Sequence, residues 1–330
     1  MIFKRITGIF GALVLAVSIG TAALADSLAV GGEAVGIRIS ANGVIVAGTS
    51  AVETENGSVS PAEEAGIRKG DVIVKLGGVE VKSAEDFTAA VAALNGDEIK
   101  VTVDRDGKQK TLKLTPAKST DGAYRLGLWL RDGISGVGTL TFYDPETGLY
   151  GALGHGISDG DTGRIVPLSD GSIFSAEIVG IKPGQRGKPG ELCGESDELY
   201  ALGDIRINCG CGIFGVADFD KSEILETGEA KQGKATIRCT LSGSEVGEYE
   251  IEIVRVFEQN GHSCFQIAVT DEALLEATGG IVQGMSGSPV IQNGRLVGAV
   301  THVFVNDPAA GYGISISDMT EAAQSCNEAA

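Results

Sequence analysis

Short apolar runs separated by turn residues recur along most of this chain, and they constrain the fold more than any other feature. From residue 125 to about 319 the runs are brief, and Gly, Asp and Ser fill the intervals between them. Regularly spaced short strands are typical of β-sandwiches and β-barrels. Only Glu272 to Ala277 has a clearly helical pattern. Roughly 200 residues suit a pair of packed antiparallel barrels, so the sequence predicts a mostly β fold.

The composition limits the kinds of partner and site that this chain can have. Its 330 residues favour two domains over one, and its 49 glycines fit a protein with many turns. The formal net charge of −18 makes nucleic acid a poor partner, because phosphate contacts need Lys and Arg. Cys209-Gly210-Cys211 is shorter than the usual Cys-x-x-Cys motif, and the chain has three histidines. We therefore expect neither a metal nor a cofactor, and the six cysteines are free or form one or two disulfides.

The first 25 residues have the composition of a targeting segment. Lys4 and Arg5 give a positive start, Ile6 to Leu24 is almost wholly apolar, and Ala23-Leu24-Ala25 fits a cleavage site before Asp26. Cleavage by signal peptidase and retention as an N-terminal membrane anchor both fit this segment. In either case the rest of the chain is expected outside the cytoplasmic membrane.

Residues 33–117 form a smaller unit with a different order of predicted elements. Strands around Val35–Ile39 and Gly43–Ala47 precede a short helical turn ended by Gly66, then a strand and a Gly77-Gly78 hairpin. Ser83 is positioned to cap a helix that runs from Ala84 to about Leu94. Two further strands, Ile99–Val103 and Gln109–Leu114, complete the unit, and a polar link at 116–124 follows it.

This order, with AEEAGIRKGDVIVKLGGVEV at its centre, resembles a bacterial PDZ domain. The resemblance implies a groove between a strand and the second helix, where an extended peptide, including one from the chain itself, adds as an extra strand. Val35, Gly36 and Ile37 are the predicted carboxylate loop and strand, and Phe87 and Val91 are the predicted helix side of the groove. A PDZ domain that only docks on its own partner domain is the alternative.

The stretch Gly284-Met285-Ser286-Gly287-Ser288-Pro289 leads into the apolar run Val290-Ile291 and carries a candidate nucleophile. Glycines on both sides of Ser286 allow a sharp turn and close approach of a substrate. The amides of Gly284 and Ser286 are the predicted oxyanion hole. Ser288 is the competing nucleophile, but Pro289 after it has no amide. The pattern is close to the Gly-Asp-Ser-Gly-Gly-Pro loop of chymotrypsin-like proteases, which implies a double β-barrel.

A serine nucleophile needs a base, and three histidines are available. His155 lies between two glycines after an apolar strand, His302 lies in a strand just after the nucleophile loop, and His262 lies in a polar hairpin. His155 is the preferred base and His302 the alternative. The base in turn needs an orienting carboxylate. Composition leaves that choice open among five aspartates, and one of them, Asp271, is also a good N-cap for the helix at Glu272. The five are Asp159, Asp204, Asp218, Asp271 and Asp307.

The signal segment, the PDZ-like unit, GALGHGISD and TGGIVQGMSGSPVIQNGRLVGAVTHVFVNDPAAGYGI together resemble the SpoIVB peptidase family, the stage IV sporulation serine proteases of endospore-forming bacteria. The resemblance implies a triad of His155, Asp271 and Ser286. It also implies action between mother cell and forespore, by cleavage of a membrane-bound regulator that frees an intramembrane protease to process a sigma-factor precursor, and autoprocessing.

Two other functions stay open at this point. The chain could be a secreted peptide-binding module without turnover, or a general quality-control protease. HtrA proteases place the PDZ domain after the protease domain, which is the reverse of the order predicted here for residues 33–117 and 125–320.

Overall fold

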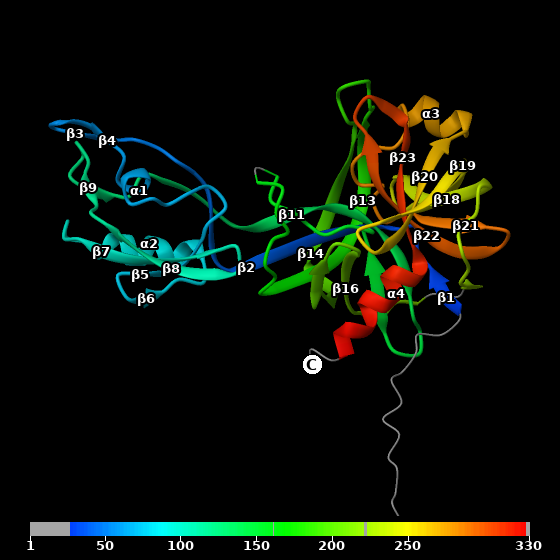
Figure 1. The fold of residues 1–330 in the computed structure, drawn as a ribbon, viewed down its shortest axis with the longest axis horizontal. Coiled ribbons are helices and arrows are strands. Elements are labelled where there is room, and N and C mark those ends of the chain that lie inside the picture. The colour runs from blue at the N-terminus through cyan, green and yellow to red at the C-terminus, as the bar shows by residue number, and fades with distance from the viewer. Residues whose placement is uncertain (1–26, 161, 221–222, 328–330) are drawn as a thin grey trace, which may run out of the picture.

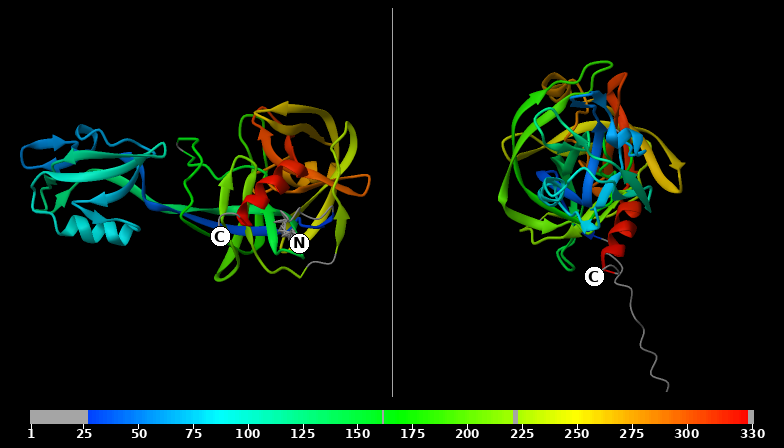
Figure 2. Two further views of the ribbon diagram at one scale, coloured as in Figure 1. Left: turned by 60° about the horizontal axis from the view of Figure 1, so that its bottom comes forward. Right: turned by 90° about the vertical axis from the view of Figure 1, so that its left-hand side faces the viewer.

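The computed structural model describes residues 27–160, 162–220 and 223–327, so the predicted targeting segment at residues 1–25 lies outside the described residues. The described chain forms two bodies joined by two long strands, β2 (Ala34–Thr49) and β11 (Leu128–Tyr143). Figures 1 and 2 show the smaller body at one end and the larger body at the other, with β2 and β11 running between them. Among the described residues, no helix is long and apolar enough to cross a bilayer.

The smaller body is the PDZ-like unit. Its elements are β3 (Val52–Thr54), β4 (Gly57–Val59), α1 (Pro61–Glu64), β5 (Val72–Leu76), β6 (Val79–Glu80), α2 (Ala84–Ala92), β7 (Ile99–Arg105), β8 (Lys108–Leu114), β9 (Ala117–Lys118) and β10 (Tyr124–Arg125). As predicted, Ser83 caps α2 by accepting a hydrogen bond from the amide of Asp86. Ile73, Val101 and Val103 are fully buried at the centre of its core.

The larger body contains a closed six-stranded barrel in the order β18-β19-β20-β23-β22-β21. Its strands are β18 (Gly233–Ser242), β19 (Glu245–Gln259), β20 (His262–Val269), β21 (Pro289–Gln292), β22 (Arg295–Phe304) and β23 (Asp307–Ser315). The predicted helix is α3 (Glu272–Thr278), between β20 and β21. Phe265, Ile267 and Val290 are fully buried inside the barrel, in agreement with the apolar runs of the sequence.

The other half of the larger body is part of a second, larger sheet. It consists of β1 (Ser27–Val30), β12 (Leu149–Ala152), β13 (Asp170–Lys182), β14 (Glu191–Asp204), β15 (Ile207–Cys209), β16 (Gly212–Val216) and β17 (Ile224–Glu226), together with one end of β2 and of β11. Helix α4 (Ile316–Gln324) and the short 3-10 turn η1 (Ser325–Asn327) pack against this half through Met319, Ala323 and Cys326.

The strands β2 and β11 belong to both bodies. Near their PDZ end Val46 pairs with Leu130, and near the other end Val35 pairs with Gly138. Residues 34–40, which the sequence groups with the PDZ domain, therefore pair with β11 and β13 inside the larger body. The PDZ-like unit is an insertion between two paired strands, and both strands run on into the wall of the site described next.

Candidate active site

The Ser286 loop lies between α3 and β21 and is held against β11. The amide of Thr139 donates to the Ser286 carbonyl at 2.9 Å, and the Thr139 hydroxyl donates to the Gly284 carbonyl at 2.8 Å. Gly287 has φ +94°, and a Cβ there would collide with the Thr139 carbonyl. The sharp turn that the sequence predicts therefore requires glycine at this position.

The loop leaves two backbone amides available for an anion. The amide of Met285 donates to Val282, and that of Gly287 donates to the Val300 carbonyl. Within the described residues, the amides of Gly284 and Ser286 donate to no acceptor. These are the two donors that the sequence assigns to an oxyanion hole.

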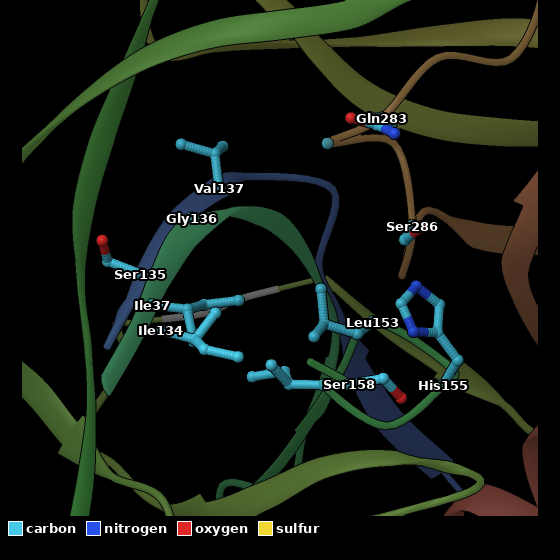
Figure 3. A pocket seen from close by; sticks show the side chains of 12 residues that line it. Ile37, Ile134, Ser135, Gly136, Val137, Leu153, His155, Ser158, Gln283 and Ser286 are labelled. Carbon is cyan, nitrogen blue, oxygen red and sulfur yellow. The ribbon is translucent and has the colours of Figure 1, made fainter. Parts of the chain in front are cut away.

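His155 lies on the other side of the same cavity. It follows β12 through Leu153 and Gly154, both with positive φ (70° and 66°), a conformation that is costly for leucine. The cavity, of about 240 Å³, is lined by Ser286, His155 and an apolar wall from β2 and β11 that includes Ile37 and Ile134. Figure 3 shows the imidazole of His155 beneath the Ser286 loop.

The hydrogen bonds of His155 fix its useful tautomer. Its Nδ1 lies 3.0 Å from the Gly156 carbonyl oxygen, which can only accept, so Nδ1 carries the proton and Nε2 is left as the acceptor. Burial lowers the pKa of His155, while the bond to Gly156 opposes that change. The imidazole is therefore neutral at pH 7 and able to take a proton.

The two candidate nucleophiles differ in their surroundings. The Ser286 hydroxyl lines the cavity and donates to the Thr301 carbonyl at 2.7 Å. Ser288 is fully buried, and its hydroxyl donates to the Met285 carbonyl at 2.6 Å. Ser286 thus lines the same cavity as His155, whereas the buried Ser288 does not line it.

His302, the alternative base, packs on His155. The ring centroids are 4.5 Å apart and the planes are tilted by 34°. Desolvation and the charge that His155 can carry both lower the pKa of His302. Its ring restrains that of His155 by contact. The third histidine, His262, is held instead by the carboxylate of Asp318, at 2.9 Å.

Asp271 does not lie with these side chains. Its carboxylate caps α3 by accepting from the Leu274 amide at 2.9 Å and also accepts from the Glu250 amide at 3.2 Å. In the described structure no hydrogen bond joins it to His155, so the geometry does not support its predicted role as the orienting carboxylate. Asp159 accepts from Thr162. The carbonyl of Gly156 occupies the place at Nδ1 that a carboxylate would take, a partner that no side-chain motif could have identified.

The predicted PDZ groove also needs correction. Val35, Gly36 and Ile37 pair with β11 on one side and β13 on the other, so no edge is left there for a peptide. The physical reason is that apolar residues recur along the whole of β2 and fit a sheet in either body, and its first half is used by the larger body.

A groove does lie beside Phe87 and Val91 of α2, opposite residues 126–129 (Leu-Gly-Leu-Trp). It has a volume of about 570 Å³. The start of β11 pairs with β2 through Leu128 and Leu130, and the α2 amide of Ala84 donates to Asp132 of β11 at 2.5 Å. In the sequence, this side of the groove could have been recognised from Leu126-Gly127-Leu128, a glycine between two leucines just after the polar link at 116–124.

Comparison with known proteins supports both units. The family model for the SpoIVB peptidase S55 matches residues 122–320, and the PDZ domain model matches residues 36–115. A probable periplasmic serine endoprotease, DegP-like, from Rhizobium meliloti is 32% identical over 163 residues, which cover 42% of this chain and 30% of that protein. A putative zinc metalloprotease of Lactococcus lactis is 28% identical over 185 residues, 53% of this chain and 40% of that one. The chain thus spans less than half the length of these relatives.

Among solved structures, the Rv3671c protease of M. tuberculosis in its active form is 15% identical, with a TM-score of 0.34 over 58% of this chain and 73% of that one. The PDZ domain of an SdrC-like protein from Listeria monocytogenes is 23% identical, with a TM-score of 0.23 over 28% of this chain and 93% of that one. Scores this low add nothing to the argument. The family match, in contrast, covers more than half of the chain and includes both His155 and Ser286, so this chain belongs to the SpoIVB peptidase S55 family.

Proposed function

We propose that this chain is a serine endopeptidase in which Ser286 is the nucleophile and His155 the general base. The observation that carries the proposal is the shared cavity: Ser286, His155 with an acceptor Nε2, and two uncommitted amides all meet there. A hydroxyl, a neutral imidazole and a pair of N–H donors are the groups that acyl transfer from a peptide requires.

The reaction follows from this arrangement. Ser286 rotates away from Thr301, gives its proton to Nε2 of His155 and attacks the peptide carbonyl. The Gly156 carbonyl accepts the hydrogen bond that Nδ1–H donates throughout the reaction and stabilises the imidazolium that forms. The amides of Gly284 and Ser286 bind the oxyanion, and loss of one such donor typically costs about 2.7–4 kcal/mol of barrier. His155 then protonates the leaving amine.

The proposed substrate is a polypeptide that the PDZ-like groove presents to the catalytic body. Membership of the SpoIVB peptidase family supports a narrower proposal: an exported enzyme, held at the membrane or released from it, that cleaves a membrane-bound regulator in sporulation signalling and trims its own N-terminal region. The apolar cavity wall at Ile37 and Ile134 favours an apolar residue next to the cleaved bond.

Labelling with a fluorophosphonate tests the catalytic proposal. Ser286→Ala should abolish both labelling and peptide cleavage, because the remaining serine of the loop is buried. Ser288→Ala should keep labelling within about tenfold and lose some stability, because only a structural hydrogen bond is removed. Labelling that survives Ser286→Ala and disappears with Ser288→Ala would contradict the assignment, and a folded wild type that never labels would favour a binding module without turnover.

A further inference from the structure

A cluster of thiols lies beside the segment that holds His155. Cys209 ends β15 and Cys211 precedes β16, in one tight hairpin. The sulfur of Cys211 lies 3.6 Å from Nδ1 and 3.8 Å from Nε2 of His262, and Asp318 holds that imidazole. Two more cysteines, the half-buried Cys264 and the buried Cys326, face the pair.

The surroundings of the two sulfurs make them unequal. The thiol of Cys211 and the amides of Cys211 and Gly212 donate to the sulfur of Cys209, and together with His262 they lower the pKa of Cys209 to about 6. The same contact raises the pKa of Cys211. The contact therefore favours the thiolate form at Cys209 and keeps Cys211 as the thiol that donates to it. A stabilised thiolate beside a second thiol is the arrangement of a reactive dithiol.

We propose that Cys209 and Cys211 are a peroxide-reactive dithiol whose oxidation changes the position of His155. The Cys209 thiolate attacks the terminal oxygen of a hydroperoxide, the O–O bond breaks, and the alkoxide takes the proton of Cys211 to leave as an alcohol. The Cys211 thiolate then attacks the sulfenic sulfur of Cys209, the S–O bond breaks, and hydroxide leaves as water with a proton from solvent. Two thiol electrons reduce one peroxide, and a disulfide remains.

The hairpin is packed against the segment that holds His155. A Cβ on Gly156 would lie 2.6 Å from the Cys209 carbonyl oxygen, and one on Gly212 would lie 2.6 Å from that of Ala152. The Asn208 side chain accepts from the Ile157 amide at 2.7 Å and donates to the Ile157 carbonyl at 3.0 Å. A disulfide fixes two Cβ atoms about 3.5–4.5 Å apart and so constrains the turn. Because the turn packs this closely on Gly156, we expect the constraint to shift the segment whose Gly156 carbonyl orients His155.

Small molecules can approach this region from a second cavity, of about 400 Å³. The three histidines of the chain, His155, His262 and His302, all line it, together with Gly210 of the hairpin and Cys264. The His262 side chain is 41% exposed and Gly210 is exposed, so the hairpin is open to solvent on this side. Among the described residues, no group of three or more His, Cys, Asp or Glu could hold a metal ion.

Mass spectrometry of the full chain tests the dithiol. Hydrogen peroxide should remove two hydrogens from the wild type, and peptide mapping should assign the bridge to Cys209–Cys211. Cys193→Ser, near the end of β14 that lies away from β15, is the matched control and should behave like the wild type. Cys211→Ser should give a sulfenic acid that dimedone traps at Cys209. At pH 6.5 iodoacetamide should alkylate Cys209 about ten times faster than Cys193. Equal alkylation rates, or a bridge between another pair, would overturn the assignment.

The effect on His155 rests on the proposed function, and the readout is fluorophosphonate labelling of Ser286. Oxidation should slow the labelling of the wild type about tenfold, and dithiothreitol should restore the original rate. In Cys209→Ser, peroxide should leave the labelling rate unchanged. A bridge that forms without slowing Ser286 overturns the coupling. A reduced protein that never labels overturns the proposed function. In that case the mass measurement still tests whether Cys209 and Cys211 form a disulfide.

Discussion

Asp271 is the residue at which the family pattern and the geometry disagree most sharply. As an N-cap, the Asn amide oxygen can replace the carboxylate oxygen that accepts from Leu274, whereas Ala leaves the Leu274 amide unpaired; the bond from the Glu250 amide is lost in both variants. We therefore expect Asp271→Asn to retain activity within a few-fold, and Asp271→Ala to lose about 1 kcal/mol of stability with kcat changed little at low temperature. Thermal unfolding and peptide hydrolysis measure the two effects. A fall of about 10⁴ in kcat for Asp271→Asn would instead assign it to a triad.

The pKa of His155 sets the expected pH dependence. Burial lowers it below the usual value of 6.5, so the base form persists into mildly acidic solution. The acid limb of kcat/KM should therefore have its midpoint below pH 6.5. The unfolded chain binds a proton at His155 more readily than the folded chain, so this residue's contribution to stability is present above pH 6.5 and is lost as the pH falls below that value. A pH profile of fluorophosphonate labelling checks the midpoint, and a value above 6.5 would contradict the described surroundings of His155.

At the scale of elements, peptide binding in the groove between α2 and β11 can be followed by the fluorescence of a residue in the groove. Trp129 is the chain's one tryptophan, lines this groove and is 65% exposed. A peptide that ends in valine and adds as a strand beside Leu128 should bury the indole and shift its emission to the blue. Val91→Lys should abolish the shift, because a charge would occupy the apolar side of the groove. The same charge at Val179 of β13, exposed on the other body, is the matched control and should leave the shift intact.

Prediction from sequence succeeded where local chemistry decides the structure. The backbone conformation of the glycines around Ser286 and His155, and the helix cap at Ser83, depend on only a few neighbouring residues. It failed where partners are remote: alternating apolar residues at Val35–Ile37 fit either body, and an aspartate before a helix looks the same as a cap or as a triad member. The carbonyl that bonds to His155 carries no side-chain signal, so only folded coordinates reveal it.

At the scale of the whole molecule, the insertion of the PDZ-like unit makes a specific deletion testable. Ser40 of β2 pairs with Gly133 of β11, so an Asn-Gly turn in place of residues 41–132 should close these strands as a hairpin. We expect this variant to fold and to label at Ser286. Removal of residues 27–121 should leave an unfolded chain, because it deletes β1 and half of the cavity wall. Circular dichroism and fluorophosphonate labelling compare the two, and the reverse order of stability would contradict the shared-strand architecture.

The pairing of Ala34 with Thr139 and of Val35 with Ser175 also has a consequence for biosynthesis. On the ribosome, the inserted unit can collapse as soon as its own contiguous residues have emerged, because its contacts are local. The first strands of the larger body must wait for partners made a hundred or more residues later, and Ser286 is translated later still, more than a hundred residues after Ser175. The cavity at His155 and Ser286 is therefore completed only after the PDZ-like unit has already folded on the nascent polypeptide.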